Sequence, residues 1–174
     1  MSIRLVVPTI EHKESALDFK QEFIVNGESV INGSELLDQM EEYEEWLTAV
    51  TNNAHSETVN PEWVLTDTFF AVDDLDTIVG IVDLRHELKG FLLDFGHCGY
   101  SVRPTQRRQG YATEMLKLIL NVAYASGMDQ LQLSVERHNK ASVKTIIANG
   151  GVYERTFELD GEPVDVYVIK TGGA

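Results

Sequence analysis

The sequence predicts an α/β domain in which helices flank a mixed, mostly antiparallel sheet. One observation is a change of pattern, because apolar residues at helical spacing dominate up to about residue 50, whereas short apolar runs separated by turns begin at Thr68. The other is a strand, helix, strand succession between Gly96 and Val135, which predicts a right-handed crossover with two parallel strands. Together they indicate the element order β-α-α-β-β-β-α-β-α-β-β.

The N-terminal third is expected to hold one short strand and two helices. Ile3–Val7 is an apolar run that Pro8 ends, and Thr9 caps a helix of about Glu11–Val25. Ser34 caps a second helix, Ser34–Val50, with an apolar stripe of Leu36, Leu37, Met40, Tyr43, Trp46, Leu47 and Val50. The opposite face is acidic. Two interpretations stay open for it: a solvated helix face, which is the commoner case, and a docking surface for a cationic substrate.

The remaining elements follow from turn residues and apolar spacing. Gly127 ends the long helix as a C-terminal glycine does, and the dipeptide Asp160-Gly161 is typical of a tight hairpin turn. The expected strands are Thr68–Val72, Ile78–Arg85, Gly96–Val102, Leu131–Val135, Val152–Leu159 and Pro163–Lys170, and the expected helices are Arg108–Ser126 and Lys140–Ala148.

Length and charge limit the classes of function. A chain of 174 residues is expected to form one domain over residues 1–174. With 28 acidic and 14 basic residues its net charge is −14, which repels phosphate backbones and anionic lipids, so no nucleic-acid or membrane partner is expected. No apolar run is long enough to span a bilayer and no secretory signal is seen, which favours a cytoplasmic location. The single cysteine, Cys98, argues against a disulfide or a metal cluster.

The stretch Tyr100–Thr113 carries the strongest functional signal. It holds three of the chain's fourteen basic residues, Arg103, Arg107 and Arg108, directly before a helix N-terminus, where a polyanion would bind. Gly110 lets the backbone approach a ligand, and the small Ala112 leaves the N–H groups of the first helical turn accessible. The stretch therefore predicts a phosphate-binding loop.

This loop lies in a wider pattern that resembles the GNAT superfamily of acyl-CoA-dependent N-acyltransferases. The resemblance covers about Thr68–Gly151, and Arg107–Ala112 matches the family signature of Gln or Arg, two residues, Gly, one residue, and Gly or Ala. It implies a GNAT-type fold and acetyl-CoA as the co-substrate.

The resemblance also implies which residues bind coenzyme A. The pyrophosphate would lie on the loop and the first helical turn, the pantetheine arm would pair with the strand Tyr100–Val102, and Asn139 would reach that arm with help from Ser142. The implied set is Tyr100, Ser101, Val102, Arg107, Arg108, Gln109, Gly110, Tyr111, Ala112, Thr113, Asn139 and Ser142.

Proton transfer is less clearly marked. Many family members have a tyrosine seven residues after the asparagine, placed to protonate the leaving thiolate. This chain has Ile146 at that position, which leaves Tyr153, Tyr167 or water to supply the proton. Attack on a thioester needs a neutral amine, so a base is useful, and His97, with an ordinary pKa of about 6.5, is the candidate catalytic residue. A surface or hydrogen-bonded histidine is the alternative. Further base candidates are Asp83, His86, Glu87, Asp94 and Glu136, and Cys98 is expected to be inert filling.

These patterns predict an N-acetyltransferase that moves the acetyl group of acetyl-CoA to a primary amine of a small molecule or peptide by direct attack. The acidic body favours a cationic amine. The alternative is a CoA-binding sensor or interaction module without turnover, which Ile146 keeps open. The acceptor, the acyl chain and the oligomeric state stay open, a homodimer being one alternative.

Overall fold

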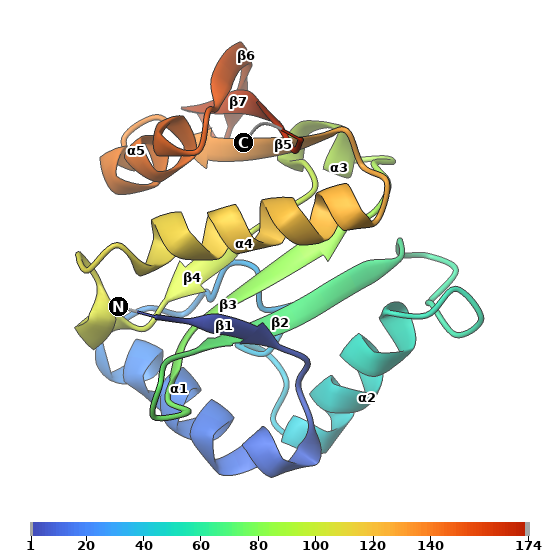
Figure 1. The fold of residues 1–174 in the computed structure, drawn as a ribbon, viewed down its shortest axis with the longest axis vertical. Coiled ribbons are helices and arrows are strands. Elements are labelled where there is room, and N and C mark those ends of the chain that lie inside the picture. Colours follow the sequence, from blue (N-terminus) through green and yellow to red (C-terminus); the bar gives the residue numbers. More distant parts are fainter. Residues whose placement is uncertain (1, 173–174) are drawn as a thin grey trace.

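The computed structural model describes residues 2–172 and arranges them as two antiparallel sheets with helices packed on them (Figure 1). The first sheet has the order β1 (Arg4–Val6), β2 (Thr66–Val72), β3 (Ile78–Arg85), β4 (Tyr100–Val102). The second has the order β5 (Gln130–Glu136), β7 (Glu162–Lys170), β6 (Val152–Leu159). The helices are α1 (Lys13–Val25), α2 (Tyr43–Asn53), α3 (Leu92–Phe95), α4 (Tyr111–Ala125) and α5 (Lys140–Ala148), with 3-10 turns η1 (Ile10–His12) and η2 (Pro104–Gln106). The predicted α/β class with flanking helices is confirmed.

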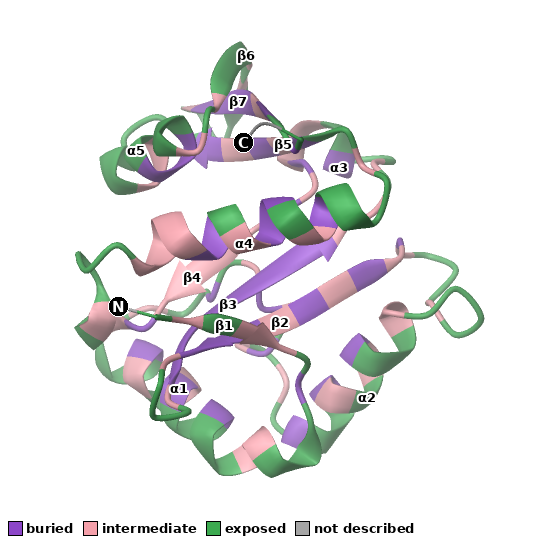
Figure 2. Ribbon diagram, viewed as in Figure 1, coloured by how far each residue is buried: buried purple, intermediate pink, exposed green. Residues whose placement is uncertain are grey.

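Two apolar cores lie on opposite faces of the first sheet. On one face α1 and α2 bury side chains such as Phe19 and Trp46 against Phe70 and Ile81. On the other face α4 packs against both sheets, which joins β2 and β3 to β5, α5 and β7 in one cluster. Figure 2 shows β3 buried along its length and α4 buried on its inner side only. Alternate residues of β3 therefore face different layers, as the period of a strand requires.

The predicted parallel pairing of the strand Gly96–Val102 with Leu131–Val135 is wrong. Within residues 2–172, β4 pairs only with β3 and β5 only with β7, and a single antiparallel bridge joins Gly96 to Leu133. Gly96 has φ +91°, and a Cβ there would lie 2.2 Å from the carbonyl oxygen of Gln132. This close contact turns the chain before β4 begins at Tyr100, so the two strands separate. Each sheet keeps an unpaired edge.

The predicted helix Ser34–Val50 is also too long. The described structure has turns from 33 to 39, and α2 begins at Tyr43. Glu35 and Leu36 adopt φ values of 50° and 72°, which a right-handed helix excludes. Tertiary contacts hold the turns: Asp38 accepts the Ile31 N–H at 2.7 Å, and the Trp46 indole donates to the Ser34 carbonyl at 2.8 Å. Of the predicted stripe residues before α2, Leu37 is buried and Met40 packs against the same core, whereas Leu36 is exposed.

The C-terminal hairpin agrees with the sequence. Strands β6 and β7 pair antiparallel around Asp160 and Gly161, whose φ values of 52° and 81° fit the turn that this dipeptide favours. The long helix is the other close match, although α4 starts at Tyr111 rather than Arg108. Arg108 has φ 65°, so the chain is still turning at that point.

Candidate active site

Six consecutive backbone N–H groups at the start of α4 lack a protein acceptor. The N–H groups of 108–113 donate to no acceptor within residues 2–172, and the helix ladder starts with the Glu114 N–H bonding to the Gly110 carbonyl at 3.1 Å. The left-handed conformations of Arg108 and Gly110, with φ 65° and 84°, produce the tight turn into the helix. Free N–H groups at a helix N-terminus form a site for an anion. Gln109, Tyr111, Ala112 and Thr113 all contribute donors to this group.

The three arginines of the loop have different surroundings. Arg103 is only 6% exposed, and its guanidinium binds the Ile78 carbonyl at 2.7 Å and the carboxylates of Asp18 and Glu22 at 2.9 Å each. It stacks over Phe19, 5.5 Å from the ring centre. The expectation that all three arginines serve a polyanion is therefore wrong for Arg103, because α1 supplies its anions.

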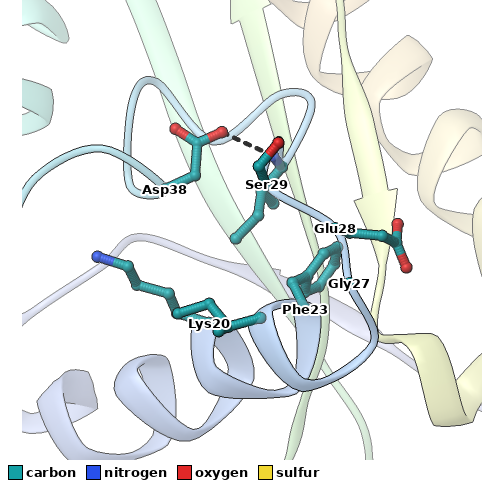
Figure 3. A pocket seen from close by; sticks show the side chains of 8 residues that line it. Lys20, Phe23, Gly27, Glu28, Ser29 and Asp38 are labelled. Atoms are coloured by element: carbon teal, nitrogen blue, oxygen red, sulfur yellow. Dashed lines mark hydrogen bonds between the residues drawn. The ribbon is translucent and has the colours of Figure 1, made fainter.

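Arg107 and Arg108 remain at the surface beside the free N–H groups. Arg107 makes a two-point ion pair with Glu28, at 2.9 and 2.8 Å, and lies over Phe23. Figure 3 shows Phe23 and Glu28 at the end of α1, where they line a pocket of about 290 Å³. Arg108 is exposed and forms no ion pair within residues 2–172. An incoming phosphate would meet Arg108 directly and would compete with Glu28 for Arg107.

The edge of β4 continues from this loop. Asp83 donates its N–H to the Gly99 carbonyl, and Arg103 donates to Val79, so odd-numbered residues bond toward β3. The N–H and C=O groups of Tyr100 and Val102 then point toward the free edge, whereas Ser101 bonds inward. The Val102 carbonyl already accepts from the Arg107 guanidinium at 3.2 Å. A ligand with amide groups could pair with that edge as an added strand.

Three predicted cofactor residues meet beside this edge. The Tyr100 hydroxyl lies 2.6 Å from the Ser142 hydroxyl, which joins β4 to α5 across the space between the sheets. Asn139 caps α5, since its side-chain oxygen accepts the Ser142 N–H at 3.2 Å. The amide nitrogen of Asn139 stays available for a ligand. Burial raises the pKa of Tyr100 to about 12, so its hydroxyl keeps its proton at neutral pH.

The position at which many family members carry the tyrosine is occupied by a buried isoleucine, Ile146. Ile146 is 1% exposed within the core, and Gly151 packs so closely on it that a Cβ at 151 would lie 2.4 Å from the Ile146 side chain. Tyr153 bonds to Thr156 at 2.7 Å, and Tyr167 stacks on Tyr153. Neither tyrosine forms a contact with β4 comparable to that of Ser142 with Tyr100.

His97 connects the two sheets. Its main-chain N–H donates to the Gln132 carbonyl at 2.7 Å, and its Nδ1 accepts the Gln132 N–H at 2.9 Å, which leaves the proton of the neutral ring on Nε2. Burial, with Arg85 and His86 nearby, lowers the pKa of His97 to about 4. Its basic nitrogen is therefore occupied, and this geometry favours a positioning role over that of a base.

Most of the other base candidates are paired or remote. Asp94 binds Arg155 at 2.7 Å, His86 binds Asp67 at 2.8 Å, and Glu136 lies 3.1 Å from His138, while Glu87 is exposed. Burial raises the pKa of the Cys98 thiol, which keeps it protonated and a poor nucleophile. Asp83 is paired too, with Arg85, but it is buried on β3 and accepts the N–H of Gly99, the residue before β4.

Asp83 forms a carboxyl pair with Glu35. One Asp83 oxygen accepts the Gly99 N–H at 2.6 Å, and the other accepts from Arg85 at 2.8 Å. The Glu35 carboxyl accepts the Trp63 indole N–H at 2.9 Å and lies 3.9 Å from the same guanidinium nitrogen of Arg85 that binds Asp83. Burial, and then the charge of Asp83, raises the pKa of Glu35 to about 8.

The sequence placed Glu35 on the acidic face of the predicted helix Ser34–Val50, for which a solvated face and a docking surface for a cationic substrate both stayed open, and it did not single out Glu35 as a site residue. The only signal nearby is the Asn32-Gly33 dipeptide, which indicates a turn but not which side chain the turn directs inward. The structure puts Gly33 directly on the Gly99 carbonyl, 2.3 Å from an added Cβ. That contact brings Glu35 over β3.

A row of aromatic side chains begins at Trp63, which bonds to Glu35. Trp63 packs against Phe91, Phe91 against Phe95, and Phe95 against Phe157, with ring centres 5.7 to 5.9 Å apart. Trp63 and Phe91 also line a surface pocket of about 340 Å³. The indole of Trp63 thus has one side at the surface and donates from its edge to the buried carboxyl pair.

The free N–H groups of 108–113 at the start of α4 form a cradle of donors, called the N–H cradle below, and the free edge of β4 follows on from it. This arrangement suits an extended ligand that carries phosphate groups. The family model described as an acetyltransferase (GNAT) domain matches residues 6–152 of this chain. The chain therefore belongs to the GNAT family and is an acyl-CoA-dependent acetyltransferase, as its motifs predicted. A comparison with curated proteins gives no significant match.

Solved structures share the fold at low sequence identity. RimL, described as a ribosomal L7/L12 alpha-N-protein acetyltransferase in complex with coenzyme A, is 14% identical, with a TM-score of 0.69 over 98% of this chain and 94% of that one. A spermidine N-acetyltransferase chimera of SpeG from Vibrio cholerae and hSSAT is 14% identical, with a TM-score of 0.67 over 98% and 97%. The GNAT domain of S. lividans PAT is 15% identical, with a TM-score of 0.62 over 97% and 89%. At these identities the likeness shows the fold alone.

Two further findings concern the described residues. No helix between residues 2 and 172 is both long enough and apolar enough to cross a bilayer. The same residues contain no group of three or more His, Cys, Asp or Glu side chains arranged to hold a metal ion.

Proposed function

We propose that the protein is an N-acetyltransferase that transfers the acetyl group of acetyl-CoA to a primary amine by direct attack. The observation that carries this proposal is the row of six free N–H groups over 108–113, continuous with the free edge of β4. Its length and polarity suit a ligand with a pyrophosphate at one end and amide groups along an arm. GNAT acetyltransferases use acetyl-CoA, and the chain has the donors that this molecule requires.

Each part of the cradle has a separate role in the proposal. The N–H groups of 108–113 and the guanidinium groups of Arg107 and Arg108 hold the pyrophosphate. The N–H and C=O groups of Tyr100 and the N–H of Val102 pair with the pantetheine amides, and the free amide nitrogen of Asn139 reaches the same arm. Free N–H groups of the β4 edge would polarise the thioester carbonyl and stabilise the oxyanion.

A cationic amine is the favoured acceptor class. The net charge of −14 attracts cations over most of the surface and disfavours anionic acceptors. Proteins with the same fold differ in acceptor, since one is described as a spermidine N-acetyltransferase and another as a ribosomal-protein acetyltransferase. The fold therefore supports the reaction without selecting the amine.

A thiol-release assay tests the proposal. Acetyl-CoA is offered with spermidine, phosphinothricin, methylamine or a peptide with a free N-terminus, and acetylated product is identified by mass. Ala112→Asp puts a carboxylate among the free N–H groups, where an acidic residue also favours the helix start, so CoA binding should fall at least tenfold with folding intact. Ala112→Ser is the matched control. Wild-type CoA affinity in Ala112→Asp would refute the cradle assignment.

A CoA-binding module without turnover is the second candidate. The observation that favours it is Ile146, which is buried where many family members carry a proton donor. The Tyr100 hydroxyl, held by Ser142 and protonated at neutral pH, can supply this proton instead. Calorimetric binding of CoA with no acetyl transfer to any amine of the panel would select the module.

A further inference from the structure

We propose that the carboxyl pair Glu35–Asp83 is the acceptor site, which receives the primary ammonium group of the substrate and takes its proton. The inference rests on the proposed acetyl transfer and names the residues that select and activate the amine. Asp83 comes from β3, and Glu35 comes from the turns between α1 and α2, on the sheet face opposite α4. The pair therefore reaches β4 from the side that the N–H cradle leaves free.

The pair lies directly against the chain that enters the β4 edge. Asp83 holds the Gly99 N–H at 2.6 Å, and Tyr100, the next residue, is the first to turn its polar groups toward the free edge. A group bound at Asp83 is thus one residue from the edge on which the acyl-carrying arm is proposed to lie. Attack requires the amine to lie next to the thioester carbon, and this arrangement would place the two groups side by side.

An unpartnered hydroxyl group beside Asp83 points to a ligand that donates hydrogen bonds. Thr68 lies directly opposite Asp83 in the β2–β3 register and is 6% exposed, and its hydroxyl has no partner. Ser34, next to Glu35 in the chain, is 1% exposed, and its hydroxyl is also unpartnered. A buried polar group without a partner is unfavourable, and an ammonium group could satisfy it together with the carboxylates.

The charge of the site fits one ammonium group. With one proton on the pair, the negative charge of Asp83 balances Arg85, and loss of that proton leaves a single net negative charge. The other titratable groups nearby do not change this sum at neutral pH: the Cys98 thiol and the His97 ring are held neutral. His86 is engaged by Asp67 on β2.

The geometry of Glu35 is not that of a structural ion pair. Arg85 is already neutralised by Asp83 at 2.8 Å and lies 3.9 Å from Glu35, so it does not require a second carboxylate. Glu35 also adopts a left-handed backbone with φ 50°, which is unfavourable for a residue with a side chain. A strained backbone that brings two carboxyl groups together is typical of a functional site.

The reaction balances with the pair as the proton acceptor. The bound R–NH3⁺ gives one proton to the carboxylates, and the R–NH2 lone pair forms a C–N bond to the thioester carbon. The C–S bond then breaks, and the leaving thiolate takes one proton while the attacking nitrogen loses its second. The net change is R–NH3⁺ plus acetyl-CoA to the acetamide, CoA–SH and one released proton. Because burial places the Glu35 pKa near 8, the pair exchanges protons in the range where the enzyme works.

Glu35→Gln tests the pair, with the exposed Glu41→Gln as its matched control. In Glu35→Gln we expect kcat/KM for the best amine of the panel to fall about 100-fold or more, CoA affinity to be unchanged, and the rise of rate with pH near 8 to disappear. Thr68→Val is a second variant, which should raise KM for the amine without loss of stability. Wild-type rates and pH profile in Glu35→Gln would overturn the inference.

A binding measurement separates this inference from the reaction itself. Calorimetry of each amine with the CoA-bound protein, in two buffers of different ionisation enthalpy, should show close to one proton released per amine bound at pH 7 in the wild type and none in Glu35→Gln. An inactive wild type that still shows this proton release would refute the proposed function alone. Amine binding without proton release, or no binding of any amine, would overturn the carboxyl pair as the acceptor site.

Discussion

Replacing Glu35 with glutamine should change how the stability of the folded protein depends on pH. The side chain of Glu35 is 13% exposed, and burial together with the charge of Asp83 raises its pKa, so the folded state holds the Glu35 proton more tightly than the unfolded chain does. Glutamine keeps the shape and cannot ionise. The comparison therefore isolates one titrating group, since the other ionisable side chains of the protein are the same in both variants.

The direction of the effect follows from the raised pKa. The pKa of Glu35 rises from 4.5 to about 8, so its contribution to stability is complete below pH 4.5 and is lost as the pH rises through 8. At about 1.36 kcal/mol per pKa unit, the full loss has an upper limit of about 5 kcal/mol. For a chain of this size each kcal/mol corresponds to roughly 2 to 4 °C in Tm. The Tm difference between Glu35→Gln and the wild type could therefore grow by about 10 to 20 °C.

Thermal unfolding at closely spaced pH values between 5 and 9 would measure this difference. We expect Glu35→Gln and the wild type to unfold at similar temperatures near pH 5, with the variant increasingly more stable at higher pH. Glu41→Gln, a change of the same kind at an exposed position, should follow the wild type throughout. A constant difference between Glu35→Gln and the wild type across the range would show that Glu35 is ionised in the fold, and the reasoning about the pair would be refuted.

Three other substitutions separate binding from stability. Glu28→Gln should raise CoA affinity about two- to fivefold in calorimetry at low salt, because the exposed Glu28 carboxylate competes for Arg107; an unchanged affinity would exclude Arg107 from the site. Arg103→Met should lower the free energy of unfolding by about 2 to 3 kcal/mol in urea and leave CoA affinity unaltered, since its guanidinium is buried among α1 carboxylates and the Ile78 carbonyl. Ile146→Tyr should cost about 1 to 3 kcal/mol in the same measurement without raising kcat, because Gly151 leaves no space beside Ile146; a faster enzyme would contradict that packing.

Local patterns were sufficient to predict the geometry on which the proposed cofactor site rests. The turn, the small residues and the helix start of Arg107–Thr113 are contiguous in sequence, and the free N–H groups follow from the way any helix begins. Asn139 and Ser142 are likewise near neighbours, one turn apart on α5. For such sites the sequence spacing is the geometry, so the pattern predicted them.

The acceptor side depends on contacts between residues far apart in the chain. Glu35 and Asp83 are separated by 48 positions and meet because Gly33 packs on Gly99. Helical periodicity placed Glu35 on the wrong surface, since Leu36, Leu37 and Met40 fit a helical stripe although the segment forms turns in which Leu37 is buried and Leu36 is exposed. The spacing of apolar residues predicts which side of a segment is buried. It does not predict a left-handed turn that contacts with distant side chains stabilise.

The sequence by itself therefore determined the α/β class, the family and the turn with free N–H groups at the start of α4, because each depends on residues close together in the chain. The tertiary structure alone decided that β4 and β5 separate after Gly96, that Arg103 is neutralised by α1, and that Glu35 reaches Asp83. These outcomes depend on which elements pack against one another, and the energies of burial and charge pairing that select them arise only when the chain is folded.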